Sequence, residues 1–237
     1  MACSSATRRS GPTATARSPK NLLTGAVDGL LLNIGHVPAE LAGLQGIGRK
    51  VVAVAVPIPA IDQVSAAKEA VSYLIALGHR RIAHIGGPPS VTSEGRLKGY
   101  RLALSSAGIA PNDALVRFGH NTIPSGQAAA TELLADSTRP TALFCANDEM
   151  AIGAIIAAKS IGLRVPGDLS VVGFDDIEMA AFYDPPLTTI HQPRREIGRV
   201  GLTELLALLE GRRKRSGRRI TLEHSLIVRG STEPVST

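Results

Sequence analysis

Residues 141–176, TALFCANDEMAIGAIIAAKSIGLRVPGDLSVVGFDD, predict one complete strand, helix and strand in succession. The runs 142–146 and 170–174 are uninterrupted apolar stretches of strand length. Between them, isoleucines recur at helical spacing over 149–161, behind Asp148 as the predicted N-cap. Two buried strands joined by a helix indicate a parallel sheet, in which ligands bind beyond the carboxyl ends of the strands.

The same alternation continues on both sides of this unit. Further strands are predicted at 27–33, 50–56, 81–85, 115–118, 187–191 and 220–228, and further helices at 38–44, 63–77, 94–107, 125–134 and 194–209. Such regularity is typical of doubly wound α/β proteins, with helices on both faces of parallel sheets. Residues 1–20 are polar and aperiodic, so we expect a disordered tail there.

The positive charge is concentrated in two short runs. The net charge is +6, but residues 1–20 hold four basic residues and 211–219 hold six, which leaves 16 basic and 20 acidic residues elsewhere. We therefore interpret both runs as solvated segments and not as a DNA-reading surface. No signal-peptide core and no apolar run of roughly 18 residues is found, which predicts a cytoplasmic protein without membrane insertion.

The sequence lacks the common motifs for catalysis, metal binding and cofactor binding. Gly86 and Gly87 follow a predicted strand, but two prolines come next, and neither G-x-G-x-x-G nor a P-loop is present. The six histidines lack metal-ligand spacing, and G-x-S-x-G is absent. We expect no enzyme activity, no metal and no cofactor.

Polar residues instead follow four predicted strands: Thr92, Arg96, Asn147, Asp175 and Gln192. Amide, carboxylate and guanidinium groups offer donors and acceptors suited to the recognition of hydroxyl groups. Alternatively, each residue could serve locally as a helix cap, a turn residue or a surface charge. Their convergence on one edge of a sheet favours a binding site.

Five segments together resemble the effector-binding domain of LacI-family transcription regulators, the family of the lactose and purine repressors. They are GHRRIAHIGGPP (78–89), GRLKGYRLAL (95–104), PTALFCANDEMAIGA (140–154), LRVPGDLSVVGFDDIEMA (163–180) and DPPLTTIHQPRREIG (184–198). They occur in the family's order, and the resemblance extends from about residue 27 to residue 232.

The resemblance implies a two-lobed type I periplasmic-binding-protein-like fold that binds a small effector, such as a sugar, and forms a homodimer. Arg96, Asn147 and Asp175 match family effector contacts, and Thr92 and Gln192 match less closely. Asn121 aligns with a position where an aromatic residue often stacks on the ligand. The implied lobes are 21–61 with 192–221 and 62–191 with 222–237.

The family's helix-turn-helix, hinge helix and first strand, helix and strand have no counterpart in the sequence. We therefore expect an incomplete N-terminal lobe, and operator binding only through a missing N-terminal domain. A truncated frame, a misassigned start and a degenerate paralogue are the open explanations. The effector-sensing portion of a regulator is the leading interpretation. The alternatives are a solute-binding protein of a sugar transporter, which would need a leader, and an enzyme on the same scaffold.

Overall fold

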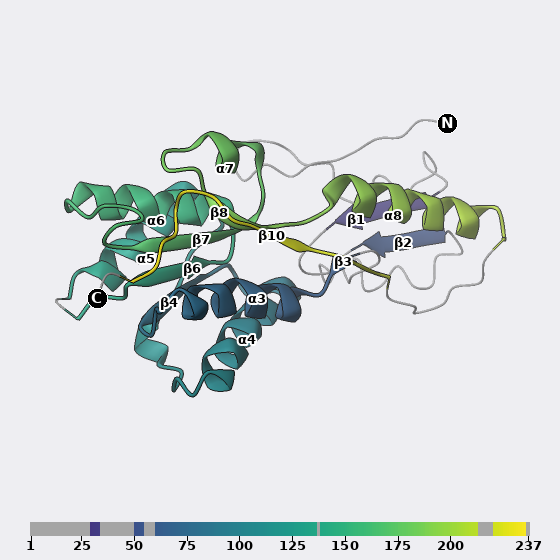
Figure 1. Ribbon diagram of the computed structural model, residues 1–237. Coiled ribbons are helices and arrows are strands. Elements are labelled where there is room, and N and C mark those ends of the chain that lie inside the picture. Colours follow the sequence, from purple (N-terminus) through teal and green to yellow (C-terminus); the bar gives the residue numbers. More distant parts are fainter. Residues whose placement is uncertain (1–28, 34–49, 55–59, 137, 213–219, 236–237) are drawn as a thin grey trace. The chain divides into compact units, whose positions relative to one another are not determined.

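The computed structural model describes residues 29–33, 50–54, 60–136, 138–212 and 220–235 (Figure 1). The predicted tail at 1–20, the predicted helix at 38–44 and most of the basic run 211–219 lie outside these residues. The chain divides into two compact units, residues 60–194 with 221–237, and residues 1–59 with 195–220. We call them the major unit and the minor unit.

The described elements of the major unit alternate between strands and helices along most of its length. They are β3 (Ala60–Ile61), α3 (Gln63–Ala76), β4 (Ile82–Gly86), α4 (Val91–Ser106), η2 (Asp113–Leu115), β5 (Val116–Phe118), α5 (Ile123–Leu134), β6 (Ala142–Cys145), α6 (Asp148–Ser160), β7 (Ser170–Asp175), α7 (Glu178–Phe182), β8 (Thr188–His191), β9 (Thr221–Leu222) and β10 (Ser225–Ile227).

Six strands form the central sheet in the order β10-β8-β7-β6-β4-β5. β4 to β8 are parallel to their neighbours, as the sequence predicts, and β10 pairs antiparallel with β8. The carboxyl ends of the parallel strands therefore lie along one edge of the sheet. β3 and β9 pair with each other in a separate two-stranded sheet.

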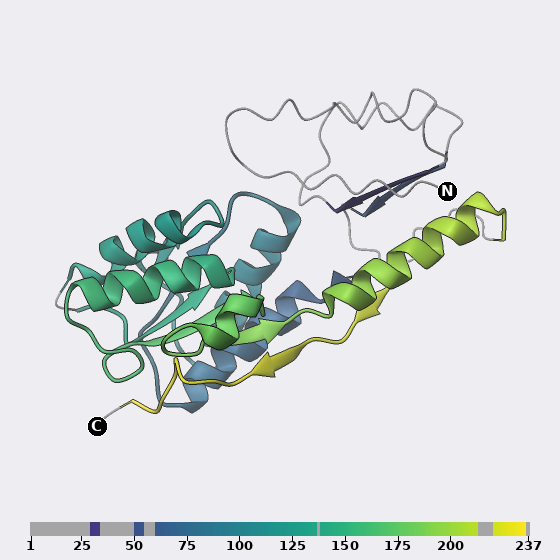
Figure 2. The same cartoon turned by 90° about the horizontal axis from the view of Figure 1, so that it is seen from above.

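Helices cover both faces of the central sheet, α5 and α6 on one face and α3 and α4 on the other (Figures 1 and 2). Alternate residues of each strand point to opposite faces, so β6 sends Leu143 and Cys145 toward α5 and α6 but Phe144 toward α3 and α4. Both faces are buried, which explains why β6 and β7 read as continuous apolar runs.

Two glycines allow α5 and α6 to pack closely. A Cβ at Gly126 would lie 2.3 Å from the Met150 carbonyl oxygen, and one at Gly153 would lie 2.1 Å from that of Ile123. Real Cβ atoms do not approach so closely, so the helix backbones can meet here only because both positions lack a side chain.

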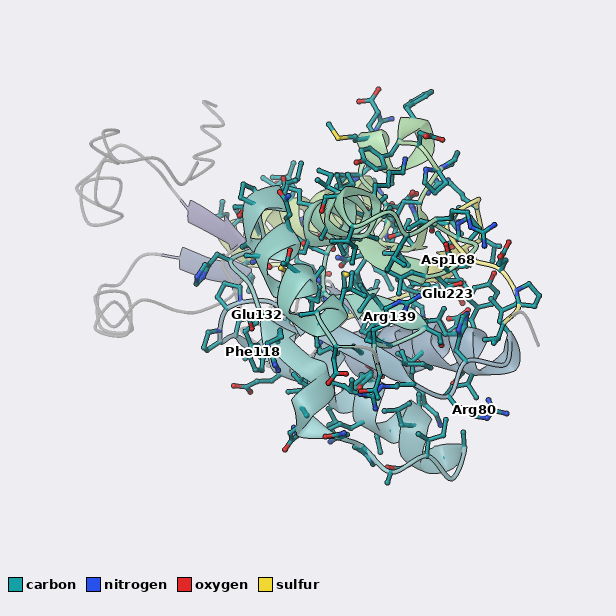
Figure 3. All side chains as sticks on the ribbon, turned by 90° about the vertical axis from the view of Figure 1, so that its left-hand side faces the viewer. Arg80, Phe118, Glu132, Arg139, Asp168 and Glu223 are labelled. Atoms are coloured by element: carbon teal, nitrogen blue, oxygen red, sulfur yellow. The ribbon has the colours of Figure 1, made fainter. Side chains whose placement is uncertain are left out.

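The charged side chains labelled in Figure 3, which are Arg80, Glu132, Arg139, Asp168 and Glu223, lie on the outside of the major unit. Arg117 of β5, for example, pairs with Glu132 of α5 at 2.8 Å on the surface. Phe118 at the end of β5 is 61% exposed, although its ring covers the backbone of Gly86 on the adjacent strand.

The last described residues bind the sheet at its amino end. The Ser231 hydroxyl donates to the Val171 carbonyl at 2.6 Å and accepts the Thr188 N–H at 2.8 Å. The Val171 N–H in turn donates to the Ser231 carbonyl at 2.8 Å. Ser231 is fully buried. Its hydrogen bonds connect β7 and β8 to the carboxyl-terminal segment.

The minor unit has three described elements: β1 (Gly29–Asn33), β2 (Lys50–Val54) and most of α8 (Arg194–Leu209). β1 and β2 are parallel and in register from the pair Gly29 and Lys50 to the pair Asn33 and Val54. Both strands and α8 were predicted from the sequence.

Three helix starts differ from the predictions, among them that of α5, which begins at Ile123 and not at Ser125. α4 begins at Val91 and not at Glu94, because the Ser90 hydroxyl caps it by accepting the Ser93 N–H at 3.1 Å. α6 is capped by Asn147, whose side chain accepts the Met150 N–H at 2.9 Å, so the prediction that Asp148 is the N-cap is wrong. Asp148 is the first helical residue and is fully buried.

Candidate functional site

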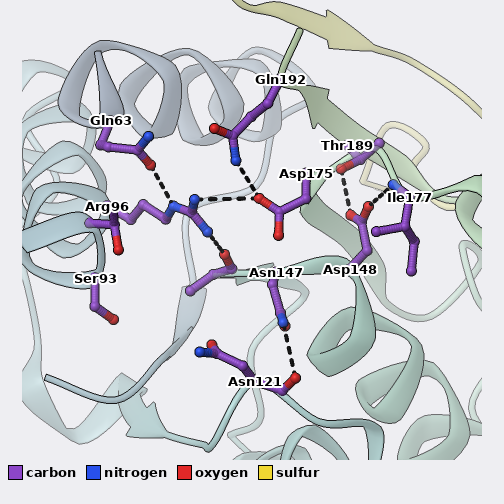
Figure 4. Close-up of polar contacts among 12 residues, drawn as sticks. Gln63, Ser93, Arg96, Asn121, Asn147, Asp148, Asp175, Ile177, Thr189 and Gln192 are labelled. Carbon is purple, nitrogen blue, oxygen red and sulfur yellow. Dashed lines mark hydrogen bonds and ion pairs between the residues drawn. The ribbon is translucent and has the colours of Figure 1, made fainter. Parts of the chain in front are cut away.

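Polar side chains on or just after six different elements gather at the carboxyl edge of the parallel strands. We call Gln63, Arg96, Asn121, Asn147, Asp175 and Gln192 the edge cluster. Gln63 begins α3, Arg96 lies on α4, and Asp175 is the last residue of β7. The other three follow β5, β6 and β8 (Figure 4). All six belong to the major unit.

Arg96 is at the centre of the edge cluster. Its Nε donates to Gln63 Oε1 at 2.8 Å, one terminal nitrogen donates to the Ala146 carbonyl oxygen, and the other lies 3.4 Å from Asp175 Oδ1. The guanidinium also stacks on Phe174, with Cζ 3.7 Å from the ring centroid. Only 9% of the residue is exposed, so its orientation is fixed from several sides.

Burial is the main cause of a lowered pKa at Arg96, and the negative charges of Asp175 and Asp148 oppose it. Arginine remains charged at neutral pH in proteins, so the site keeps a positive group among its carboxylates.

Asp175 is shared between Arg96 and Gln192. Gln192 Nε2 donates to Asp175 Oδ1 at 2.5 Å, the same oxygen that faces Arg96. The backbone of Asp175 has φ of 111° and that of Asp176 has φ of 52°, conformations that are uncommon for residues other than glycine. Two successive left-handed residues indicate a turn that the surrounding structure must hold.

Asn147, which follows β6, contacts Asn121, which follows β5. While Asn147 Oδ1 caps α6, its Nδ2 donates to the Asn121 carbonyl at 3.2 Å. Asn121 is left-handed with φ of 59°, and its own Oδ1 lies 2.6 Å from where a Cβ on Gly87 would be. Next to it, the buried Ser93 hydroxyl makes no hydrogen bond within the described part of the chain.

Thr92 is the one predicted site residue that the structure does not join to the others. It is exposed in the first turn of α4, and its hydroxyl lies 3.0 Å from that of Ser90. The remaining five predicted residues form a connected edge, either by direct hydrogen bonds or through the Ala146 carbonyl.

Asp176 ties the turn to the end of β8 and to the carboxyl-terminal segment. His191 Nδ1 lies 2.8 Å from one Asp176 carboxylate oxygen and Arg229 lies 2.7 Å from the other, while Arg194 donates to the Asp176 carbonyl at 2.8 Å. Burial acts to raise the pKa of Asp176, but the hydrogen bonds from Arg229 and His191 outweigh it and lower the pKa. Asp176 is thus a structural carboxylate.

Within the described residues, no group of three or more His, Cys, Asp or Glu side chains is placed to hold a metal ion. No helix among them is long and apolar enough to cross a membrane.

A periplasmic binding protein-like domain model matches residues 71–232 of this sequence. The chain is 36% identical to a regulatory protein of the LacI family from Chloroflexus aggregans, covers 80% of that solved chain and superposes with a TM-score of 0.80. This chain belongs to the LacI family. Its described residues 71–232 thus form a periplasmic-binding-protein-like domain of that family.

Other relatives agree with this assignment. The chain is 40% identical over 220 residues to the HTH-type transcriptional repressor CytR of Escherichia coli. The matched region covers 89% of this chain and 64% of that repressor. It therefore spans less than two thirds of this curated relative. A solved complex of the regulator CelR with cellobiose is 35% identical, with a TM-score of 0.82 over 90% of this chain and 68% of the other.

Sequence reasoning missed three parts of this candidate site. Gln63 gave no signal, because a glutamine at a helix start is common and its partner Arg96 is 33 residues away. The Ala146 carbonyl is a backbone group that no motif marks. For Asp148 the sequence predicts helix capping, although an acidic residue next to a predicted buried strand also suggests a buried carboxylate.

Proposed function

We propose that this chain is the effector-sensing portion of a LacI-family transcription regulator, and that the edge cluster binds a small hydroxylated effector, a sugar or a related molecule. The observation that carries this proposal is the pairing of Arg96 with Asp175 among amide side chains at the carboxyl ends of the strands. Parallel α/β sheets place their ligands at this edge.

The donor and acceptor pattern favours hydroxyl groups. A sugar hydroxyl both donates and accepts, so it can donate to the Asp175 carboxylate while it accepts from Arg96 or an amide. The Ser93 hydroxyl, which has no hydrogen-bond partner among the described residues, offers one more partner. Asn121 presents an amide and no ring, and only 3% of the chain is aromatic, which argues against an effector that depends on stacking.

The similar proteins support a sugar as the class to test. The CelR structure is described as a cellobiose complex. A LacI-family regulator from Enterococcus faecium, 26% identical with a TM-score of 0.78, is described with bound ribose. Ribose and cellobiose are therefore the first probes, followed by other pentoses, hexoses and disaccharides.

The test is isothermal titration calorimetry of the full chain with ribose and cellobiose, on the wild type and on Asp175→Asn. Asn retains the shape of Asp175 but loses the charge that faces Arg96. We expect saturable binding by the wild type, weakened by roughly tenfold to a hundredfold in the variant. Equal affinity in both proteins would show that the sugar binds elsewhere.

Operator binding, in this proposal, belongs to an N-terminal domain outside these residues, and the protein acts in the cytoplasm as a homodimer. The chain alone should bind duplex DNA weakly, without sequence preference and with a steep loss as salt rises. A footprint on one operator at physiological salt would contradict this assignment. Sedimentation equilibrium measures the dimer directly, and a monomer at all concentrations would argue against it.

A further inference from the structure

The turn that presents Asp175 is formed by two residues in left-handed conformations, Asp175 and Asp176. Neither is a glycine, so the turn is intrinsically unfavourable, and contacts from outside must hold it. Asp176 is held by His191 and Arg229. The residue that follows the turn, Ile177, is held by Asp148.

Asp148 connects three elements from a fully buried position (Figure 4). It is the first residue of α6. One carboxylate oxygen accepts the Ile177 N–H at 2.8 Å, and the other accepts the Thr189 hydroxyl of β8 at 2.5 Å. A single carboxylate therefore fixes the end of the turn against both the helix and the neighbouring strand.

β7 leaves space for this carboxylate. A Cβ at Gly173 would lie 2.2 Å from Asp148 Oδ1, so any side chain at position 173 would displace the carboxylate. Gly173 lies two residues before Asp175, the first residue of the turn, and its φ is not in the left-handed region. The glycine is thus required by the position of Asp148 and not by backbone conformation.

We propose that Asp148 is the positioning residue of the effector site: by holding Ile177 and Thr189, it fixes the turn that directs Asp175 toward Arg96 and Gln192. The inference rests on the proposed function in so far as Asp175 is an effector contact. The role of Asp148 itself can be measured without any effector.

The charge of Asp148 gives this role a pH signature. Burial raises the pKa of Asp148 to about 7, Asp175 and Asp176 act in the same direction, and the hydrogen bonds from Thr189 and Ile177 oppose them. Arg96 from α4 and the Cys145 thiol from β6 also interact with its charge. Ionisation would add a third negative charge beside the turn, so the turn should change as pH rises through about 7.

The first test is NMR of the full chain without ligand from pH 5.5 to 8.5. The signals are the Ile177 amide, the Gln192 side-chain amide and the Arg96 Nε–H. We expect the wild type to show a common transition near pH 7, and Asp148→Asn, which preserves shape, to lose it. A transition that persists unchanged in Asp148→Asn would overturn the proposal.

His191 needs a control, because histidines in general change charge between pH 5 and 8 and His191 contacts Asp176. In His191→Gln, the transition at the Ile177 amide should remain. Its loss in this variant, with retention in Asp148→Asn, would assign the pH response to His191 and remove Asp148 from the mechanism.

The second test compares Thr189→Val, which keeps the shape but removes the hydroxyl, with Thr189→Ser, which keeps the hydroxyl. Valine should shift the Gln192 and Ile177 signals and weaken ribose or cellobiose binding by roughly tenfold, and serine should restore both. If Asp175→Asn loses binding while Thr189→Val and Asp148→Asn do not, the positioning role fails and the effector site stands. If the wild type binds neither sugar, the proposed ligand class fails, and the NMR series still decides the role of Asp148.

Discussion

The guanidinium of Arg96 is constrained along its edge by Gln63, Ala146 and Asp175, and across its face by Phe174. A lysine could supply the charge but not the planar group that reaches three partners while it stacks on a ring. At position 96 the planar shape of the guanidinium therefore matters more for these contacts than its positive charge does.

We predict that Arg96→Lys weakens ribose or cellobiose binding almost as strongly as Arg96→Ala, by tenfold or more, roughly the loss expected for a charge-assisted partner. Arg101→Lys is the matched control, because Arg101 lies on the same helix and pairs with exposed Asp113. Calorimetry measures all three. Wild-type affinity in Arg96→Lys would mean that charge alone suffices.

Asp148 also makes stability depend on pH. Its folded pKa of about 7 exceeds its ordinary 3.8, so between these values the native state binds more protons than the unfolded state. The contribution is fully present below about pH 4 and is lost as pH rises through about 7. From pH 5 to 8, the free energy of unfolding should fall by roughly 1 to 4 kcal/mol on this account.

Urea unfolding of the wild type and Asp148→Asn at several pH values measures this effect. The comparison must be a difference between the two proteins, because buried His84, whose pKa burial lowers to about 4, makes stability rise with pH in part of the same range. Parallel pH curves for the two proteins would contradict the prediction.

At the scale of elements, the contact between α5 and α6 depends on absent side chains. We predict that Gly153→Ala lowers the free energy of unfolding by roughly 1 to 3 kcal/mol, because the new methyl would lie 2.1 Å from the Ile123 carbonyl oxygen. Gly198→Ala is the control. Gly198 lies within α8 with no described atom within 4 Å of the added Cβ, so alanine should raise stability by up to about 1 kcal/mol. Equal changes in the free energy of unfolding for Gly153→Ala and Gly198→Ala would show that helix propensity, and not packing, determines the stability change at both positions.

The elements of the major unit were largely predictable, and the contacts between them were not. Periodicity places β6, α6 and β7 because it records burial, which the sequence carries residue by residue. The N-cap of α6 could not be decided between Asn147 and Asp148, since both types cap helices and only the packing of β7 and β8 determines which one is buried. α7 was missed because five residues are too few for a helical period.

The arrangement of the candidate site was predictable to the same extent. Arg96 and Asp175 follow from the rule that ligands bind at strand ends, and the motifs matched them to the family. That Thr92 lies apart, and that Gln63 holds Arg96, depends on where α3 and α4 begin, which sequence patterns locate only to within a few residues.

At the scale of the whole molecule, the two units differ in how their strands are supported. β6 and β7 have partners on both sides in a six-stranded sheet, whereas β1 and β2, in the described part of the chain, pair only with each other. Two-stranded sheets are marginal without further packing.

We predict that amides of 142–145 and 170–175 exchange with solvent far more slowly than those of 29–33 and 50–54, as local stability follows the contacts that opening breaks. Hydrogen exchange read by mass spectrometry or NMR on the full chain tests this. Similar protection of both pairs of strands would show that other residues, or a partner chain, complete the minor sheet.

The hydrogen bonds of Ser231 have a consequence for the order of synthesis. β10 lies at one edge of the central sheet and Ser231 joins β7 to β8, yet both follow α8, which belongs almost entirely to the other unit. Chains emerge from the ribosome amino end first. The major unit, although most of it is made before residue 195, can reach its final sheet only after residues 225–231 have emerged. A nascent chain whose synthesis pauses while α8 is being made would expose the edge of β8 that β10 later covers. Chaperones could bind this exposed strand edge during the pause.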